Sequence, residues 1–313
     1  MNNVIAITVT FNRSHTLINT ITALLNQNYN NLNKIIIVDN CSDYGHKEKI
    51  NEISKLSDKI EVINLEENLG GAGGFYFGMK YAMDKYNPDW YWIMDDDAYP
   101  RENCLEKLMD NSESDNIGFI CPMIWGVTKK QYQIYHHKNI SLDLVDDLCV
   151  IDNIESIKER INVQANAFVG PLISKKAVER YGYPDKELFI YGDDTEYTYR
   201  ISREMDGFLV RDAIIDHEDL LKENIRSNSS LWFKEYYNLR NRILLINQYS
   251  TSFEKRIFSS FKMIFIGMRS ILAAFIKREY KGNRLKRAKV FSKAIIDGIM
   301  NKKGKRVTIE TFK

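Results

Sequence analysis

The first hundred residues alternate short apolar runs with segments of helical periodicity, and this alternation limits the chain to a small set of folds. The runs are residues 4–9, 34–39, 60–65 and 90–94, and Leu17, Ile21 and Leu24 recur at helical spacing between the first two. Residues 35–38 are apolar without interruption, as in a strand that is buried on both faces. Strands joined by such helical segments form βαβ units, so the sequence predicts an α/β fold, a Rossmann-like, mostly parallel sheet flanked by helices.

Trp90 to Met94 forms the most informative of these runs, because it ends in three consecutive carboxylates, Asp95, Asp96 and Asp97. Adjacent carboxylates repel one another, so a bound cation would lower the cost of this arrangement. Oxygen ligands at the carboxyl end of a strand suit Mg²⁺ or Mn²⁺ together with phosphate, and open α/β sheets bind ligands at that edge. The alternative is a solvated turn that leads into a helix near Pro100 and Glu102.

A second signal is the segment 68–75, in which four of five consecutive positions are glycine. It lacks the dinucleotide fingerprint, because Tyr76 stands where the third glycine would be, and no Gly-Lys-Ser/Thr follows for a Walker loop. The sequence predicts a tight turn before a helix over residues 74–85. The turn is either structural or brings backbone amides close to a phosphate-bearing ligand.

Further polar groups stand where strands end or helices begin. Asp193 and Glu196 have the spacing of a helix capping box, yet the adjacent Asp194 could also serve as a general base. His217 ends an apolar strand, a position in which a histidine is more often only hydrogen-bonded than metal-bound. Arg13 and Asp39 follow the first two strands.

Together these segments resemble the family-2 glycosyltransferases of the GT-A fold, and more narrowly the bacterial galactofuranosyltransferase-like branch. The resemblance covers residues 1–240 and rests on the segments 10–13, 38–40, 68–75, 95–97 and 192–196 and on His217. It implies that Asp95, Asp97 and His217 hold a divalent ion, Mn²⁺ or Mg²⁺, and that Asp194 is the base. It also implies a set of donor-binding residues: Thr10, Phe11, Arg13, Asp39, Asn68, Gly70, Gly71, Asp95 and Asp96.

The resemblance therefore implies an inverting, metal-dependent glycosyltransferase that moves a sugar, galactofuranose in the first instance, from a UDP-sugar to a lipid-linked or polysaccharide acceptor. A single displacement with one base and no enzyme nucleophile inverts the anomeric carbon. One alternative is a rhamnosyltransferase that uses dTDP-rhamnose. The other is a nucleotide-binding membrane scaffold without turnover, against which the joint presence of Asp97, Asp194 and His217 argues.

The C-terminal part of the chain differs in charge from the rest. Residues 253–313 contain 17 Lys and Arg against 4 Asp and Glu, a balance of +13, so that residues 1–252 carry −11 of the net +2. An apolar helical stripe, Ile257, Phe261, Ile264, Met268, Ile271 and Phe275, precedes a basic cluster that extends to Lys289. The weakly charged run from Met263 to Ile276 is too short to span a bilayer, which needs about 20 residues.

We accordingly expect a glycosyltransferase domain over residues 1–240 and a helical, basic segment over 241–313 that attaches to an anionic membrane surface. The alternative for this segment is packing on its own domain or in a homo-oligomer. Four cysteines without paired spacing and an N-terminus without signal-peptide character favour the cytoplasmic face of the membrane. Nucleic acid is not among the expected partners.

Overall fold

The computed structural model describes residues 2–141, 146–149, 154, 157–218, 228, 231–308 and 310–311. It divides into two compact units, which are described separately. The first comprises Met1–Asn139, Cys149–Asp185 and Asp194–Leu220, and the second comprises Ile140–Leu148, Lys186–Asp193 and Leu221–Lys313. The predicted boundary at residue 240 falls inside helix α7 (Trp232–Tyr249), and the two-domain division stays a prediction.

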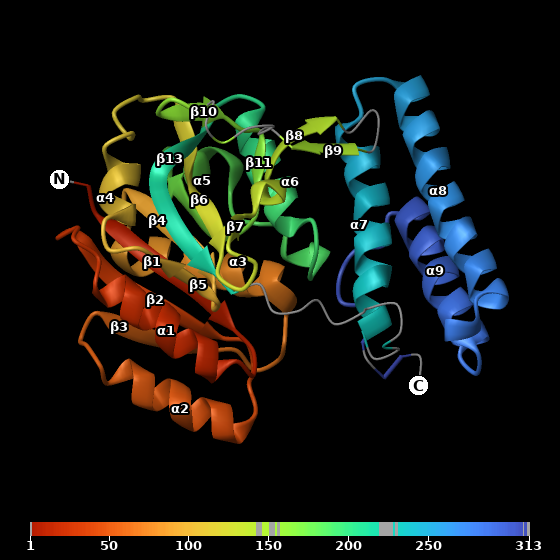
Figure 1. The fold of residues 1–313 in the computed structure, drawn as a ribbon, viewed down its shortest axis with the longest axis horizontal. Helices are drawn as coiled ribbons and strands as arrows, with labels where there is room; N and C mark the ends of the chain where they lie inside the picture. The colour runs from red at the N-terminus through yellow and green to blue at the C-terminus, as the bar shows by residue number, and fades with distance from the viewer. Residues whose placement is uncertain are drawn as a thin grey trace. The chain divides into compact units, whose positions relative to one another are not determined.

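The first unit is built on a ten-stranded mixed sheet (Figure 1). Its path runs β10-β13-β6-β12-β4-β1-β2-β3, with β5 paired to β13 and β7 to β6. The strands β3, β2, β1 and β4 are mutually parallel, whereas β12 is antiparallel to both of its neighbours. The bounds of the strands on this path are β1 (Val4–Thr10), β2 (Leu32–Asp39), β3 (Ile60–Asn64), β4 (Trp90–Asp95), β6 (Ile117–Gly126), β10 (Arg160–Asn162), β12 (Val169–Ser174) and β13 (Asp206–His217).

Helices cover both faces of this sheet, and a separate apolar cluster joins each face to its helices. One cluster joins the sheet to α1 (Ser14–Leu25), α2 (Tyr44–Ser54) and α4 (Cys104–Met109). The other joins it to α3 (Gly70–Tyr86), α5 (Lys175–Tyr181) and α6 (Asp193–Ser202). The strands between them are buried on both faces, which explains their continuous apolar runs and confirms the predicted α/β class.

Helix α3 begins at Gly70, four residues earlier than predicted, so most of the glycine-rich segment is helix and not turn. Two of its glycines lie against strands. A Cβ atom on Gly74 would lie 2.4 Å from a methyl carbon of Val9, and one on Gly78 would lie 2.6 Å from a methyl carbon of Ile7. Glycine is therefore required at these positions because the helix backbone approaches β1 too closely for a side chain.

Short elements complete the two units. They are β5 (Ala98–Pro100), β7 (Gln131–Tyr132), β8 (His137–Ser141), β9 (Asp146–Cys149), β11 (Ala165–Asn166), and the 3₁₀ turns η1 (Ile134–His136), η3 (Lys186–Leu188) and η5 (Arg278–Tyr280). The helix expected near Pro100 and Glu102 begins later, at Cys104, because Pro100 belongs to β5.

The described part of the second unit is mainly three helices, α7, α8 (Phe253–Ile276) and α9 (Arg284–Ile299). They share an apolar core that includes Trp232, Ile243, Met263 and Val290. The hydroxyl of Ser252 caps α8 by accepting a hydrogen bond from the amide of Lys255.

Among the described helices, α8 alone is long and apolar enough to cross a membrane by length and composition. It begins ten residues before Met263, which the sequence prediction took as the start of the weakly charged run. Length alone therefore does not exclude a span, contrary to that expectation. By itself this is weak evidence for a membrane-embedded helix, because core helices of soluble proteins can pass the same test.

Candidate active site

The predicted site residues lie at one edge of the sheet, where β1, β2 and β4 end. The register pairs Thr10 with Asp39 across β1 and β2, and Val9 with Asp95 across β1 and β4. Because the three strands are parallel, the polar side chains that follow them come together at their carboxyl ends, as expected for a ligand site in an open α/β sheet.

Arg13 connects the first strand to the carboxylates after β4. Its guanidinium lies 2.9 Å from Asp96 Oδ1 and 2.6 Å from Asp97 Oδ2. The hydroxyl of Thr10 donates to the other oxygen of Asp96 at 2.6 Å. Both oxygens of Asp96 are thus occupied by protein groups, so this buried side chain mainly holds Arg13 in place.

The three adjacent carboxylates perturb one another strongly. Burial, followed by the charges of Asp97 and Asp96, raises the pKa of Asp95 well above its ordinary value. Burial also raises the pKa of Asp96 to about 7, although Arg13 opposes this shift. One guanidinium does not neutralise three acids, so the cluster favours an additional positive charge.

Asp97 and His217 meet because β5 and β13 pair antiparallel, which sets His217 opposite Ala98. His217 Nε2 lies 3.5 Å from Asp97 Oδ1, and that oxygen is buried and accepts no hydrogen bond from the described residues. Burial would raise the pKa of Asp97, but His217 and Arg13 outweigh it and hold the pKa at about 2. Asp97 is therefore ionised at neutral pH.

Gln133 orients the histidine through a contact that residue spacing does not predict. Its side-chain oxygen lies 2.9 Å from His217 Nδ1 and 2.8 Å from His136 Nε2. Since an amide oxygen only accepts, His217 donates from Nδ1, and this bond turns Nε2 toward Asp97. Metal-binding histidines are commonly fixed in this way by a hydrogen bond to the other ring nitrogen.

This donor set fits a divalent cation. A buried carboxylate oxygen of Asp97 without a hydrogen bond lies 3.5 Å from the imidazole Nε2 of His217, and Asp95 adds a buried carboxyl group whose pKa is raised. Within the described residues, however, no three His, Cys, Asp or Glu side chains converge into a complete ligand set. Magnesium sites often use one or two carboxylates and take further ligands from substrate phosphates, so the metal role of Asp95, Asp97 and His217 stays a prediction.

Asp39 ends β2 and is fully buried. Its Oδ1 accepts the amide of Ser42 at 2.9 Å, whereas its Oδ2 has no hydrogen-bond partner among the described residues. A buried acceptor without a donor is costly, which is a reason to expect a donor from a ligand. Phe11, directly after β1, exposes much of its ring at the same edge.

The start of α3 joins this edge through Asn40, the residue after Asp39. The side chain of Asn40 accepts the amide of Leu69 and donates to the carbonyl of Gly70. Asn68 accepts the amide of Gly70 with its side-chain oxygen at 2.8 Å. The predicted donor residue Gly70 is thus bonded to the end of β2, with Asn68 and Gly71 next to it in the chain, so the glycine-rich segment begins beside this strand end.

Asp194, the predicted base, is the second residue of α6. It is less buried than Asp193, and its Oδ1 accepts the amide of Thr195 at 2.6 Å. Its charge also contributes to the raised pKa of Asp95, so the two carboxylates interact. Glu196, the other member of the predicted capping box, pairs instead with Arg200 four residues later.

Two buried residues of α7, neither of them among the predicted site residues, hold the loop before Asp193. The amide nitrogen of Asn241 donates to the carbonyls of Leu188, Ile190 and Tyr191 at 3.0, 2.9 and 2.7 Å. Arg240 donates to Leu188 as well, and it also bonds the side chain of Asn241. We call this arrangement the Arg240–Asn241 clamp. In the clamped loop, Phe189 and Tyr191 adopt positive φ angles of 68° and 63°, which side-chain-bearing residues rarely adopt.

Comparison with known proteins identifies the family. Residues 5–182 match the model of glycosyl transferase family 2, and the chain belongs to this family. This confirms the resemblance on which the predicted site was based.

Individual relatives are more distant. Galactofuranosyltransferase GlfT1 of Mycolicibacterium smegmatis is 28% identical over 203 residues, which cover 64% of this chain and 65% of that protein. The chain thus spans just under two thirds of that relative's length, and 55% of the GlfT1 of Mycobacterium tuberculosis strain H37Rv, which is 27% identical over 174 residues and covers 54% of this chain. The dTDP-rhamnosyl transferase RfbF of Shigella flexneri is 27% identical over 257 residues, 79% of this chain and 80% of RfbF.

Solved structures share the fold. GalNAc-T7 with UDP, GalNAc and Mn²⁺ superimposes with a TM-score of 0.65 at 15% identity, over 96% of this chain and 56% of that one. The mannosyltransferase PcManGT of Pyrobaculum calidifontis, in complex with GDP-Man and Mn²⁺, gives 0.59 at 11% identity, over 96% and 88%. The predicted GT-A fold is therefore confirmed.

Proposed function

We propose that this chain is an inverting, divalent-metal-dependent glycosyltransferase that transfers galactofuranose from UDP-galactofuranose to a lipid-linked or polysaccharide acceptor in surface-glycan synthesis. The observation that carries the proposal is the group of carboxylates around Arg13 at the carboxyl edge of β1, β2 and β4. Two buried carboxylate oxygens at this edge of the sheet, on Asp39 and Asp97, have no hydrogen-bond partner among the described residues.

These two oxygens support a nucleoside diphosphate as the ligand. The ring N3–H of uracil is a donor that would satisfy Asp39 Oδ2, with Phe11 and Thr10 at the same strand end. At the diphosphate, Asp95, Asp97 and His217 would hold Mn²⁺ or Mg²⁺. When bound there, such an ion supplies positive charge to the departing diphosphate. Arg13, fixed by Asp96, adds a second positive charge at this place.

The transfer itself requires one base. The acceptor hydroxyl oxygen forms a bond to the anomeric carbon while the bond from that carbon to the diphosphate oxygen breaks. The bonding electrons leave with the nucleoside diphosphate, and the hydroxyl proton passes to Asp194. With no enzyme nucleophile, this single displacement inverts the anomeric carbon. The exposure of Asp194, greater than that of Asp193, supports its assignment as the base.

A second candidate is rhamnosyl transfer from dTDP-rhamnose. The similarity to RfbF, which extends over more of both chains than the similarity to GlfT1, favours it. Asp39 does not discriminate, because thymine carries the same N3–H donor as uracil. A third candidate is not an enzyme but a scaffold that binds nucleotide at a membrane without turnover. The presence of Asp194, a suitable base, argues against it, because binding alone needs no base.

The basic charge of the second unit supports a location at a membrane and a lipid-linked acceptor. We propose that the basic helices α8 and α9 attach the protein as a peripheral protein to the cytoplasmic face of the cell membrane, where a lipid-linked acceptor would be presented. A homo-oligomer through the same helices is the alternative.

The proposal is tested by thermal stabilisation with a panel of UDP- and dTDP-sugars, each with and without Mn²⁺. A donor at 100 times its Kd stabilises the protein by about 2.7 kcal/mol. UDP-galactofuranose should stabilise the protein only with Mn²⁺, and Asp39→Asn should weaken this effect. Asp58→Asn, an exposed change of the same kind in the same unit, is the matched control. Stabilisation by dTDP-rhamnose alone would select the second candidate, and no stabilisation by any nucleotide would contradict both.

A further inference from the structure

Helix α8 has two apolar faces of different character. The inner face consists of the buried residues Ser259, Met263, Gly267 and Ala274, three of which are small. A Cβ atom on Gly267 would lie 2.7 Å from Ile295 of α9 and 3.0 Å from Leu239 of α7. The small residues therefore let α8 pack closely on both neighbouring helices.

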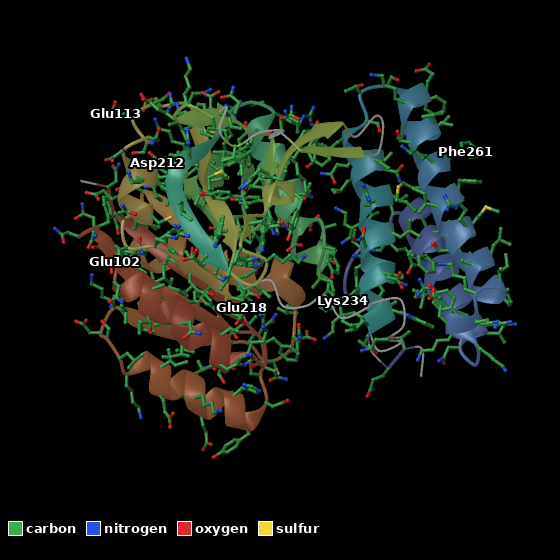
Figure 2. The ribbon with its side chains drawn as sticks, in the orientation of Figure 1. Glu102, Glu113, Asp212, Glu218, Lys234 and Phe261 are labelled. Carbon is green, nitrogen blue, oxygen red and sulfur yellow. The ribbon has the colours of Figure 1, made fainter. Side chains whose placement is uncertain are left out.

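The outer face of α8, by contrast, carries bulky side chains in solvent. Phe258, Phe265 and Leu272 follow one another at seven-residue intervals, and their exposed fractions are nearly equal, at 63%, 62% and 60%. Phe261 also points away from α7 (Figure 2). We define the outer face by its exposed apolar residues: Phe258, Phe261, Phe265, Met268, Leu272, Phe275 and Ile276. An exposed apolar surface of this size marks an interaction site.

This face differs from the stripe that the sequence predicted. Ile264 and Ile271, which belong to that stripe, are only partly exposed, whereas the fully outward Phe265 and Leu272 do not belong to it. The exposed face is therefore rotated around the helix axis relative to the predicted stripe. The helical period alone does not show this rotation, because the residues of the inner face are small and only weakly hydrophobic.

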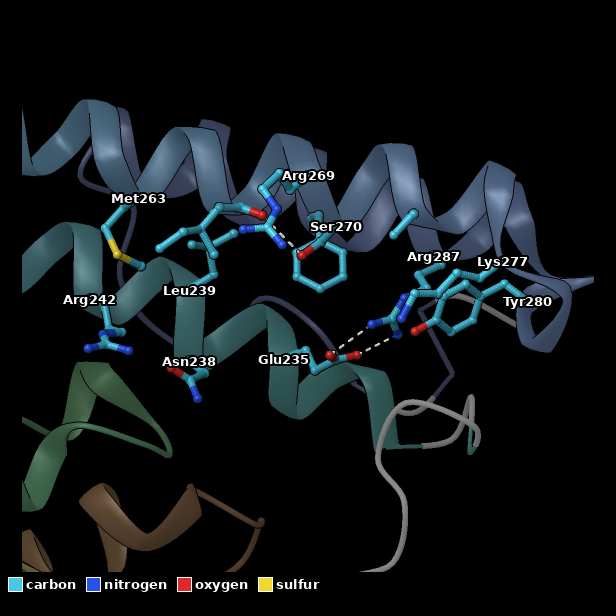
Figure 3. Close-up of a pocket in the computed structure, with 13 residues that line it drawn as sticks. Glu235, Asn238, Leu239, Arg242, Met263, Arg269, Ser270, Lys277, Tyr280 and Arg287 are labelled. Atoms are coloured by element: carbon cyan, nitrogen blue, oxygen red, sulfur yellow. Dashed lines mark hydrogen bonds and ion pairs between the residues drawn. The ribbon is translucent and has the colours of Figure 1, made fainter. Parts of the chain in front are cut away.

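The neighbours of α8 do not suit a hydrocarbon interior. Arg287 of α9 is buried and forms two hydrogen bonds to Glu235 of α7, as Figure 3 shows. Asp297 of α9 is buried and pairs with Lys293 and Arg306. The groove between α7 and α8 is lined further by Arg242, Arg269 and Lys277 (Figure 3). If α8 crossed a bilayer, the two helices packed along it would carry these charges into the membrane, where each is expensive.

The positive charge around the outer face of α8 indicates what kind of partner this face binds. Exposed cations between residues 255 and 289 accompany the outer face: Lys255, Arg256, Arg269, Lys277, Arg278, Lys281, Arg284 and Lys289. Over the described residues 253–308 the acidic residues are three, Glu254, Glu279 and the buried Asp297. A second copy docking by the same face would bring like charges together, whereas a bilayer with anionic headgroups offers both apolar contact and opposite charge.

We infer that α8 lies flat in one leaflet of an anionic phospholipid membrane, with its outer face toward the acyl chains and α7 and α9 on the aqueous side. The helix is thus an in-plane anchor and not a membrane span. The inference deepens the membrane attachment proposed above and rests on that part of the proposed function, but it makes no use of the donor site.

Depth measurement distinguishes the two orientations. Phe258→Trp, Phe265→Trp and Leu272→Trp are each introduced into the full chain, and the fluorescence of the unmodified chain is subtracted. The variants are mixed with vesicles of equimolar phosphatidylcholine and phosphatidylglycerol that carry bromine either near the headgroup or near the chain end. Leu56→Trp, exposed in the first unit, is the matched control.

In the in-plane orientation all three positions should be quenched equally, and more by the shallow bromine than by the deep one. The control should show no added quenching, and rising salt should release the protein. In a span, positions 258 and 272 would lie about 21 Å apart along the membrane normal, at a rise of 1.5 Å per residue. Position 265 would then be the deepest and the outer two shallow, which would overturn the inference.

Two further outcomes would also overturn it. One is absence of quenching together with a dimer that Phe265→Glu converts to monomer, which would assign the face to a second copy. The other is absence of quenching in a monomer. Binding of UDP with Mn²⁺, measured on the same samples, shows separately whether the donor site works, so failure of one proposal is distinguishable from failure of the other.

Discussion

The Arg240–Asn241 clamp leads to a quantitative prediction for Asn241→Ala. The two amide protons of Asn241 serve three carbonyl groups, of Leu188, Ile190 and Tyr191. A net hydrogen bond contributes about 0.5–1.5 kcal/mol, and buried groups left unsatisfied cost about 1–3 kcal/mol. Without the clamp, Phe189 and Tyr191 are also free to leave their positive φ angles, each of which stores about 1–3 kcal/mol.

We therefore expect Asn241→Ala to destabilise the native conformation of residues 188–192 by about 2–4 kcal/mol. At 1.4 kcal/mol per factor of ten, hydrogen exchange in this loop should accelerate by roughly 30- to 700-fold. Asn238→Ala, an exposed position of the same helix, is the matched control and should leave exchange unchanged. Because the loop leads directly into Asp193 and Asp194, kcat should fall more than donor affinity. Equal exchange in the two variants would refute the reasoning.

Further predictions concern the site and one buried histidine. Asp194→Asn keeps the shape of the side chain but cannot take the proton from the acceptor hydroxyl, so kcat should fall about 10²- to 10⁴-fold while donor affinity is nearly unchanged. A fall in kcat in Asp193→Asn alone would show that the other acid is the base. Asp97→Ala and His217→Ala should abolish the Mn²⁺ dependence of UDP binding in calorimetry, and unchanged dependence in either variant would remove that residue from the ligand set. Burial lowers the pKa of His137 to about 4, below its ordinary 6.5. The unfolded state therefore binds one more proton than the folded state between these values, and His137 lowers the free energy of unfolding as pH falls from 6.5 to 4. Unfolding by urea should show about 2–4 kcal/mol of this loss in the native protein and not in His137→Gln, while equal pH profiles would contradict it.

The sequence allowed prediction of those features that depend on local pattern. The strands that end at Thr10, Asp39 and Asp95 were predicted because apolar runs with polar ends need no knowledge of their neighbours. The start of α3 was predicted too late, because glycines that signal a turn in isolation are here required by the close approach of the helix to Val9 and Ile7. The predicted helical segment over residues 241–313 includes only the second half of helix α7, and the clamp formed by Arg240 and Asn241 was not predicted.

The contacts that define the site, by contrast, could not be predicted from local sequence pattern. Arg13 reaches Asp96 and Asp97 across more than eighty residues of chain, and His217 meets Gln133 through the pairing of strands that enter the sheet out of sequence order. Such contacts depend on topology, which residue spacing does not encode. The family resemblance supplied the list of residues, and the structure shows that Thr10, Arg13, Asp95, Asp96, Asp97 and His217 gather at one sheet edge.

Inverting sugar transfer from a UDP-sugar is measurable as turnover followed by NMR. The protein is incubated with Mn²⁺, UDP-galactofuranose and octyl galactofuranoside as the probe acceptor, with Asp194→Asn in parallel. We predict that UDP accumulates together with a new glycosidic bond whose anomeric configuration is opposite to that of the donor, and that the variant forms little of either. Retained configuration, or tight UDP binding without transfer from UDP-galactofuranose or dTDP-rhamnose, would contradict the account.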